Sequence, residues 1–241
     1  MATKYIRKSG SDANNGTNAT TDAVLTLARG IAVSTTGDTL DFGAGTWIED
    51  LSTAYSRNFL GAGMFLTIIN GTFTGGASAV AATFTDLKIL INANFSVAFD
   101  KPLTFTRVYC DGNGFGRTVS AADLFSNTYV SNAYDSIFTG FTVVTLRIGG
   151  GSGTLSNSVF NFPGSQQTGV AIGIQTNCFL AVVYRTAAPV VRTYNAYAIG
   201  TDTVALSTGE FRTTTVAAFT DPTNGDFSLK TGSTLINKGQ A

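Results

Sequence analysis

The side chains that could carry acid–base or metal chemistry are few in this chain and lie far apart. Between positions 51 and 201 the acidic residues fall at intervals of 14, 11, 12 and 12: Asp86, Asp100, Asp111, Asp123 and Asp135. A glycosidase needs two carboxyl groups roughly 5–10 Å apart. Asp111 and Asp135, separated by 24 residues, come nearest to that requirement and are weak catalytic candidates. No interval equals a full coil of the fold inferred below, so these acids are not expected to stack into a calcium site.

Other catalytic and metal-binding groups are scarce. The 241 residues include no histidine and two cysteines, which excludes zinc fingers and histidine-dependent triads. We therefore expect no metal ion and no cofactor. Cys110 and Cys178 lie in apolar, strand-like runs and are predicted to be buried free thiols, with a disulfide or a redox pair as the alternative. The glycine-rich run 149–153 is followed by neither Lys-Ser/Thr nor a helix, so we interpret it as a turn and not as a phosphate-binding loop.

The charges are few and balanced. Fifteen basic and fifteen acidic residues make up 12% of the chain, about half the usual share in a soluble domain. The net charge of zero argues against nucleic acid as the main partner. Asp86 and Arg107 are 21 residues apart and are predicted to form an ion pair between neighbouring coils. We find no apolar run of signal-peptide or membrane-spanning length, so we expect synthesis in a cytoplasm and no membrane partner.

A repeat of short strands would position these residues. From Thr39 onward, short apolar strands alternate with turns that contain Asn, Asp or Gly. The recurring turn residues, at intervals of 22, 19, 21 and 29, are Asn70, Asn92, Asp111, Asn132 and Asn161. A period near 20 with short strands is typical of a β-solenoid, in which each strand pairs with equivalent strands in the coils above and below. We therefore predict that the five turn residues form a structural ladder of side chains at one corner.

The chain is interpreted as a single domain, residues 1–241, in three parts. Residues 1–38 are expected to form an N-terminal cap with a strand, a loop and a helix that begins at residues 21–22 and ends near Val33. Residues 39–205 are expected to form the coils, and residues 206–241 a C-terminal capping segment, because open solenoid ends are exposed sheet edges. The fold class is thus all-β, a single-stranded parallel β-helix. An antiparallel β-sandwich also has short strands, but its turns are usually 8–12 residues apart.

Both ends of the chain resemble a known family. The N-terminal segments are YIRKSGSDANNGT (5–17), GDTLDF (37–42) and GTWIE (45–49), and the C-terminal segments are DPTNGDFSL (221–229) and GSTLINKG (232–239). They resemble the opening and closing segments of the pectate-lyase-like right-handed parallel β-helix proteins. The resemblance implies a right-handed parallel β-helix with a short capping helix. The middle of the chain matches only in its period.

The resemblance does not imply one activity, because this fold carries lyases, hydrolases, adhesins and viral spikes. The resemblance implies that lyases of this fold use calcium held by acidic side chains together with an Arg or Lys base, and that hydrolases of this fold use clusters of Asp. The spacing of the acids in this chain fits neither arrangement, and a catalytic role for Arg107 is less favoured than the ion pair. We therefore do not expect an enzyme.

The function expected from these observations is that of a non-catalytic structural protein of a bacteriophage particle, either a capsid decoration protein or a spike or fibre. Its partners would be other virion proteins of the capsid or tail, its location would be the virion, and a homo-oligomer is compatible with this role. A bacterial adhesin is less favoured, and an ice-binding face would need matched threonines, for which Thr85, Thr106 and Thr128 give a loose match.

The main alternative is a module that binds or degrades carbohydrate, including a glycan of the host surface. Exposed aromatic side chains on one face of a solenoid could stack on sugar rings, although packing in the core or at an interface is their more common role. The aromatic residues considered for this role are Tyr129, Tyr134, Phe138, Phe141, Tyr184, Tyr194 and Tyr197.

Overall fold

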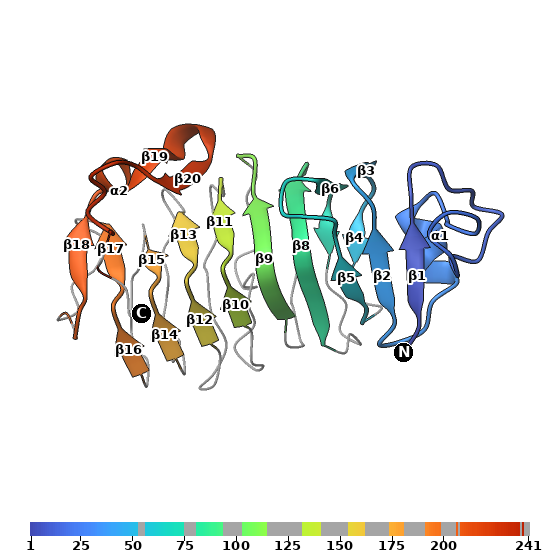
Figure 1. Ribbon diagram of the computed structural model, residues 1–241, viewed down its shortest axis with the longest axis horizontal. Helices are drawn as coiled ribbons and strands as arrows, with labels where there is room; N and C mark the ends of the chain where they lie inside the picture. Colours follow the sequence, from blue (N-terminus) through green and yellow to red (C-terminus); the bar gives the residue numbers. More distant parts are fainter. Residues whose placement is uncertain are drawn as a thin grey trace.

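The fold is a stack of parallel strands in which each coil adds a layer to the one before it (Figure 1). The computed structural model describes residues 1–52, 56–74, 81–93, 103–114, 132–140, 154–161, 174–180, 191–198, 206, 208–236 and 238. Every strand pair along the stack is parallel. The predicted parallel β-solenoid is therefore confirmed, and the antiparallel sandwich is excluded.

The described strands of the main sheet fall into two series. One series is a continuous path from the first coil to the last, and it contains β1 (Thr3–Ile6), β2 (Thr39–Phe42), β5 (Asn58–Leu60), β8 (Ala82–Ile91), β9 (Leu103–Asp111), β11 (Ile137–Thr139), β13 (Val159–Asn161), β15 (Phe179–Leu180), β17 (Ala196–Ala198) and β18 (Phe211–Thr213). The other series runs beside it and contains β3 (Gly45–Ile48), β6 (Thr67–Gly71), β10 (Asn132–Tyr134), β12 (Thr154–Ser156), β14 (Ile174–Thr176) and β16 (Val191–Thr193). A separate parallel pair contains β4 (Leu51–Ser52) and β7 (Phe73–Thr74).

Aromatic rings inside the stack hold successive coils together. Register aligns Phe59, Phe84 and Phe105 in one inward column, and Phe138 and Phe160 in another. The ring centroids of neighbours along this series are 4.9–5.3 Å apart, close to the spacing of about 4.7–4.9 Å between paired strands. All five rings belong to one buried apolar cluster. The two columns meet where Phe105 contacts Phe138. Together they form one continuous series of rings, which we call the column of rings.

Most coils that follow β6 are kinked by a residue with left-handed backbone conformation. In β8 and β9 the kink lies within a continuous strand, at Asp86 (φ 55°) and Arg107 (φ 52°). In the later coils it separates two short strands, as at Asp135 between β10 and β11. This conformation is unfavourable for most residues other than Gly, Asn and Asp. Its recurrence in register shows that the stack requires the same bend at the same corner.

The N-terminal cap contains a shorter helix than the sequence predicted. The helix α1 (Leu27–Ala32) begins after Thr26, whose side chain caps the first turn. The predicted start at residues 21–22 was wrong because Val24 forms a parallel bridge with Ile6 of β1, which keeps this part of the chain extended. None of the described helices is long and apolar enough to cross a membrane.

The segment after Leu206 lies against the side of the stack. After β18 it contains the helix α2 (Thr215–Ala218), the strand β19 (Phe219–Asp221), the 3-10 turn η2 (Pro222–Asn224) and the strand β20 (Asp226–Leu229), which pairs with β19 in antiparallel fashion. Figure 1 shows this segment turning back from β18 along the neighbouring coils. Phe219 and Phe227 pack with Tyr109 and Phe179 in a second apolar cluster. The predicted capping segment therefore covers one side of the late coils.

Candidate functional site

A row of polar side chains follows the kinked corner of the stack. Register places the left-handed residues of successive coils in one column, whose described members are Gly209 and six residues with larger side chains: Asp86, Arg107, Asp135, Asn157, Asn177 and Tyr194. We call these six residues the corner row. The sequence separations between neighbouring coils here are 21, 28, 22, 20 and 17 residues. The coils therefore shorten toward the C-terminal end after one long coil.

Members of the corner row bind one another from coil to coil. Arg107 donates from Nε and from a terminal guanidinium nitrogen to the two carboxylate oxygens of Asp86, at 2.6 and 2.7 Å. These bonds raise the pKa of Arg107 above its ordinary value. The Asn157 amide donates to a carboxylate oxygen of Asp135, and the Asn177 amide donates to the amide oxygen of Asn157. Each of these hydrogen bonds is 3.1 Å long. The structure thus brings Asp86 and Arg107 together as predicted, and adds amide contacts further along the row.

A second column lies one residue after the corner row, inside the stack. We call it the inner column, and its members are Leu87, Val108, Ser136, Ser158, Cys178, Asn195 and Glu210. None is more than 8% exposed. Its first two members are apolar and the rest are polar or carry a thiol. The side chains of this column therefore change from apolar to polar between β9 and the coil that follows.

Three polar members of the inner column, Ser136, Ser158 and Asn195, accept hydrogen bonds from backbone N–H groups of the preceding coil. The hydroxyl of Ser136 accepts from the Val108 N–H at 3.1 Å, and the hydroxyl of Ser158 accepts from the Ser136 N–H at 3.2 Å. The Asn195 side chain accepts from the Cys178 N–H at 3.0 Å. A buried N–H without an acceptor costs about 1–3 kcal/mol. These side chains therefore satisfy donors at the point where the kink interrupts the backbone ladder.

The prediction of a single ladder of five turn residues was wrong, because they lie in different columns. Register aligns Asn70 with Leu90 and then with Asp111, Thr139 and Asn161. Three of the predicted residues therefore do share a column, but an apolar residue and a threonine stand between them.

The two remaining residues of the predicted ladder lie elsewhere. Asn92 follows the end of β8, where its N–H donates to the carbonyl of Gly71. Asn132 begins β10 and contacts Thr104, 28 residues earlier. The prediction assumed coils of nearly equal length. The coil between Thr104 and Asn132 is 28 residues long, so Asn132 does not lie in the column to which the prediction assigned it.

The two carboxylates considered as catalytic candidates are not brought together by the register. Asp111 ends β9 and is aligned with Thr139, whereas Asp135 lies at the corner before β11. Asp111 pairs with Lys88, with the ammonium and a carboxylate oxygen 3.3 Å apart. Asp135 accepts a hydrogen bond from Asn157. Each carboxylate is thus held by a side chain of an adjacent coil.

The two thiols lie where the sequence predicted. Cys110 and Cys178 are free and buried. Burial raises the pKa of both thiols, and that of Cys178 reaches about 12. Among the described residues, no group of three or more Cys, Asp or Glu side chains is arranged to hold a metal ion. Asp100, Asp123 and the run 149–153 lie outside the described residues.

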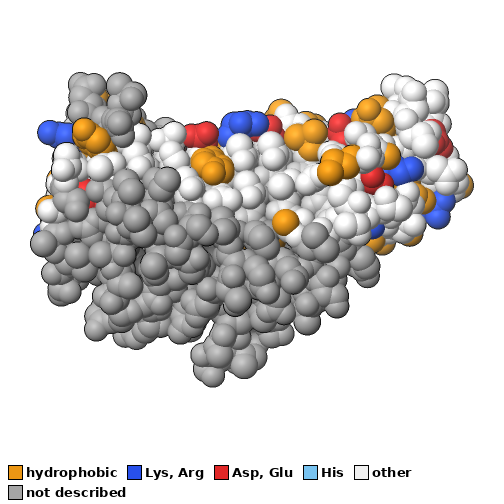
Figure 2. Space-filling view, turned by 90° about the horizontal axis from the view of Figure 1, so that it is seen from below, with side chains coloured by type: hydrophobic (Ala, Val, Ile, Leu, Met, Phe, Trp, Pro, Cys, Tyr) orange, Lys and Arg blue, Asp and Glu red, His pale blue; other side chains and the backbone are white. Residues whose placement is uncertain are grey.

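Outward residues next to the corner row form two columns of uncharged polar side chains. One contains Thr83, Thr104, Asn132 and Thr154, and the other contains Thr85, Thr106, Tyr134 and Ser156. We call these eight residues the polar face, and all of them are partly exposed. Thr85 and Thr106 are neighbours in it, while Thr128 lies outside the described residues. On the face that Figure 2 shows, the charged side chains of the described residues lie mainly along the upper edge and at the right-hand end.

The aromatic residues considered for sugar stacking have different environments. Phe138 is in the core, Tyr134 is on the polar face and Tyr194 is partly exposed in the corner row. Residues outside the described part of the chain are Tyr129, Phe141 and Tyr184, and the side chain of Tyr197 is not described either.

A five-residue repeat in the sequence carries the signal for the corner row and the inner column. Its copies are YDSIF (134–138), SNSVF (156–160), TNCFL (176–180), TYNAY (193–197) and TGEFR (208–212). The second residue of each copy lies at the corner and the third enters the inner column. Aligning these segments, in place of single Asn residues, gives the register that the structure shows.

No protein-family model matches this chain, and neither a curated protein nor a solved structure matches it. The parallel β-solenoid is established by the strand pairing alone. Membership of the pectate-lyase-like family and an origin in a bacteriophage stay predictions from the residues at the two ends of the chain.

Proposed function

We propose that this protein is a non-catalytic structural subunit of a bacteriophage particle, a decoration, spike or fibre protein that docks on other virion proteins. The observation that carries the proposal is how the described carboxylates between β8 and β17 are used. Each binds a side chain of a neighbouring coil: Asp86 binds Arg107, Asp111 binds Lys88 and Asp135 binds Asn157. These carboxylates are thus occupied by contacts between neighbouring coils, and the polar face next to them is uncharged.

The polar face is suited to docking because the stack fixes its side chains. Successive hydroxyl and amide groups repeat at the strand spacing of about 4.8 Å, and neighbours bind one another, as when the Asn132 side chain accepts from the Thr154 N–H at 3.0 Å. A surface ordered in advance loses less entropy when a partner binds. The resemblance of the chain ends to a family that includes viral spikes supports the same function.

The direct test is the composition of virus particles whose genome carries the gene. Quantitative mass spectrometry of purified particles should find this chain at a fixed ratio to the major capsid or tail protein. Particles made without the gene should lack that component and regain it when the wild-type gene is supplied. A chain that stays in the soluble fraction and never copurifies with particles would refute the proposal.

Charged substitutions can locate the docking surface. The double variant Thr104→Asp with Tyr134→Asp places two carboxylates on the polar face and should abolish incorporation, because unpaired charges are costly to bury at an interface. The matched control is the double variant Thr20→Asp with Thr21→Asp in the N-terminal loop, where both side chains are exposed. If both proteins fold, by circular dichroism, and are incorporated equally, the polar face is not the docking surface.

A second candidate function is carbohydrate binding on the same face. It is favoured by Tyr134, which is partly exposed and aligned with Thr106 and Ser156 in the neighbouring coils. An aromatic ring flanked by hydroxyl groups offers both a stacking surface and hydrogen bonds to a sugar. A panel of bacterial surface polysaccharides should then bind wild type and lose binding to Tyr134→Ala, while absence of binding and of cleavage by wild type would remove this candidate.

A further inference from the structure

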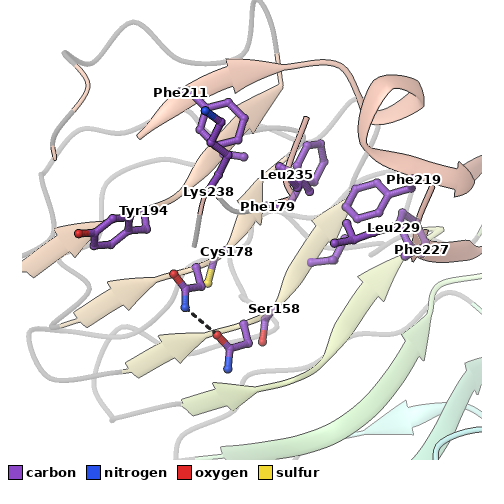
Figure 3. Close-up of a pocket in the computed structure, with 14 residues that line it drawn as sticks. Ser158, Cys178, Phe179, Tyr194, Phe211, Phe219, Phe227, Leu229, Leu235 and Lys238 are labelled. Carbon is purple, nitrogen blue, oxygen red and sulfur yellow. Dashed lines mark hydrogen bonds between the residues drawn. The ribbon is translucent and has the colours of Figure 1, made fainter. Parts of the chain in front are cut away.

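The C-terminal segment closes a pocket over the late coils. Val159, Phe179 and Ala196, which are aligned outward residues of β13, β15 and β17, form its floor. Phe219 and Phe227 line it from the antiparallel pair β19–β20. Its volume is about 300 Å³. Figure 3 shows the apolar side chains of the floor and of the C-terminal segment facing one another.

Fewer than half of the described residues that line the pocket carry polar or titratable side chains: Asn157, Ser158, Asn177, Cys178, Tyr194 and Lys238. The corner-row amides of Asn157 and Asn177 line one side and are hydrogen-bonded to each other. Lys238 lines the pocket beside Phe211 (Figure 3). A concave apolar site with a small number of polar groups is the usual form of a small-molecule site.

We propose that this pocket binds a small amphipathic anion, with an apolar body on the floor and a carboxylate or sulfonate at Lys238. The volume is about twice the ~150 Å³ of an apolar cavity that accepts benzene, so the apolar body has about a dozen non-hydrogen atoms. Aromatic rings at the walls favour a flat body, because offset or edge-to-face contacts add to the burial of apolar area.

Charge complementarity selects an anion over a cation. Lys238 is exposed and forms no ion pair with any carboxylate of the described residues, and the described residues that line the pocket include no Asp or Glu. A ligand cation would meet like charge at the rim and would leave its own charge against an apolar floor. This inference does not depend on the function proposed above.

The test uses two probes of the same shape, 2-naphthoate and the neutral 2-naphthalenemethanol, in fluorescence titrations of the full chain. Wild type should bind 2-naphthoate saturably, with a Kd of about 1 mM or tighter. Lys238→Gln should weaken naphthoate binding about threefold, as expected for an exposed ion pair, and should leave the neutral probe unchanged. The matched control Lys4→Gln removes an equal charge from the N-terminal cap and should bind both probes as wild type does.

Two further measurements place the probe in the molecule. Ala196→Leu fills the floor and should abolish binding of both probes while the far-ultraviolet circular dichroism is retained. Amide shifts of wild type on adding 2-naphthoate should concentrate at Phe179 and Ala196 and spare the N-terminal cap. The proposal is overturned if wild type shows no saturable binding, if the shifts lie elsewhere, or if a folded Ala196→Leu binds as well as wild type.

Discussion

At the kinked corner, the early coils place Leu87 and Val108 inside the stack, whereas the later coils place Ser136 and Ser158 at the equivalent positions. In β8 and β9 the strands continue through the kink, and Leu87 and Val108 are themselves paired in register. In the later coils the strands on either side are two or three residues long. Where the strand is interrupted, a side chain inside the stack supplies the acceptor that the backbone does not.

The comparison shows that one fold is held together in two ways along its length. The early coils depend on apolar packing, with Phe84 and Phe105 fully buried between long strands. The late coils depend more on side-chain hydrogen bonds, which individually contribute less than a buried ring. Losses of stability from substitution should therefore be largest in the early coils.

The largest effect is expected in the column of rings. Phe105→Ala should lower the free energy of unfolding by about 3–5 kcal/mol, because it removes a buried ring that stacks on Phe84 and meets Phe138 edge to face, and because it leaves a cavity. Urea denaturation followed by circular dichroism measures the loss. Phe65→Ala is the matched control, since Phe65 is 62% exposed, and it should change stability by less than about 1 kcal/mol. Equal losses in the two variants would contradict the role assigned to the column.

A smaller effect is expected in the inner column of the late coils. Ser158→Ala leaves the buried N–H of Ser136 without an acceptor and should cost about 1–3 kcal/mol in the same urea assay. Ser156→Ala, two residues earlier on the polar face, is the control and should be within about 0.5 kcal/mol of wild type. If Ser158→Ala is as stable as the control, the hydrogen bond does not support the corner.

Part of the loss of unfolding free energy in acid should arise from the Asp38 carboxylate, at the N-terminal end of the stack. The Ala2 N–H donates to the Asp38 carboxylate at 2.6 Å, and the N–H and hydroxyl of Thr35 also bind it. These bonds lower the pKa of Asp38 to about 2. Because the folded pKa lies below the unfolded one, the stabilisation is present above about pH 4 and is lost as the pH falls toward 2.

The size of this contribution is at most about 2 kcal/mol. Unfolding free energies measured from pH 5 to pH 2 should fall more steeply for wild type than for Asp38→Asn, which cannot lose this charge. Parallel curves for the two proteins would show that another group is responsible.

The smallest effect is expected at the exposed ion pair of the corner row. Arg107→Gln should cost about 0.2–1 kcal/mol, because half of the Arg107 side chain is exposed to water and exposed pairs contribute little. The loss should shrink in 1 M salt, where the screening length is about 3 Å. A cost above 2 kcal/mol would place this pair among the main supports of the fold.

Several features followed from the sequence because they depend on local period and residue type. The spacing of the strands predicted the parallel stack, and the separation of Asp86 from Arg107 equals one coil, so their pairing could be foreseen. Cys110 and Cys178 were predicted as buried thiols from their apolar neighbours. These predictions needed only the length of one coil or the character of one strand.

The rest depended on contacts that the spacing does not contain. One coil of 28 residues broke the assumption of equal intervals and separated Asn132 from the ladder assigned to it. The left-handed corner includes Arg107 and Tyr194, residue types that rarely adopt this conformation, so composition did not identify it. The inner column was missed because Ser136 and Ser158 look like ordinary turn residues until the five-residue copies are aligned.

The N-terminal segments that carry the family resemblance also have structural roles that no period predicts. The Asp12 carboxylate accepts from the N–H groups of Leu25 and Thr26 before α1, at 3.0 and 2.9 Å. The Glu49 carboxylate accepts from the N–H of Leu27 at 3.0 Å. Asp12 thus joins two parts of the cap to each other, and Glu49 joins the cap to the first coils.

Side chains of the inner column satisfy backbone donors at the corner of the late coils. The most direct test is amide hydrogen exchange by nuclear magnetic resonance in wild type and Ser136→Ala. The Val108 N–H, which donates to the Ser136 hydroxyl, should be protected in wild type and lose about tenfold of its protection in the variant, while the Phe84 and Phe105 amides keep theirs. Unchanged protection at Val108, or an equal loss at all three amides, would contradict the claim.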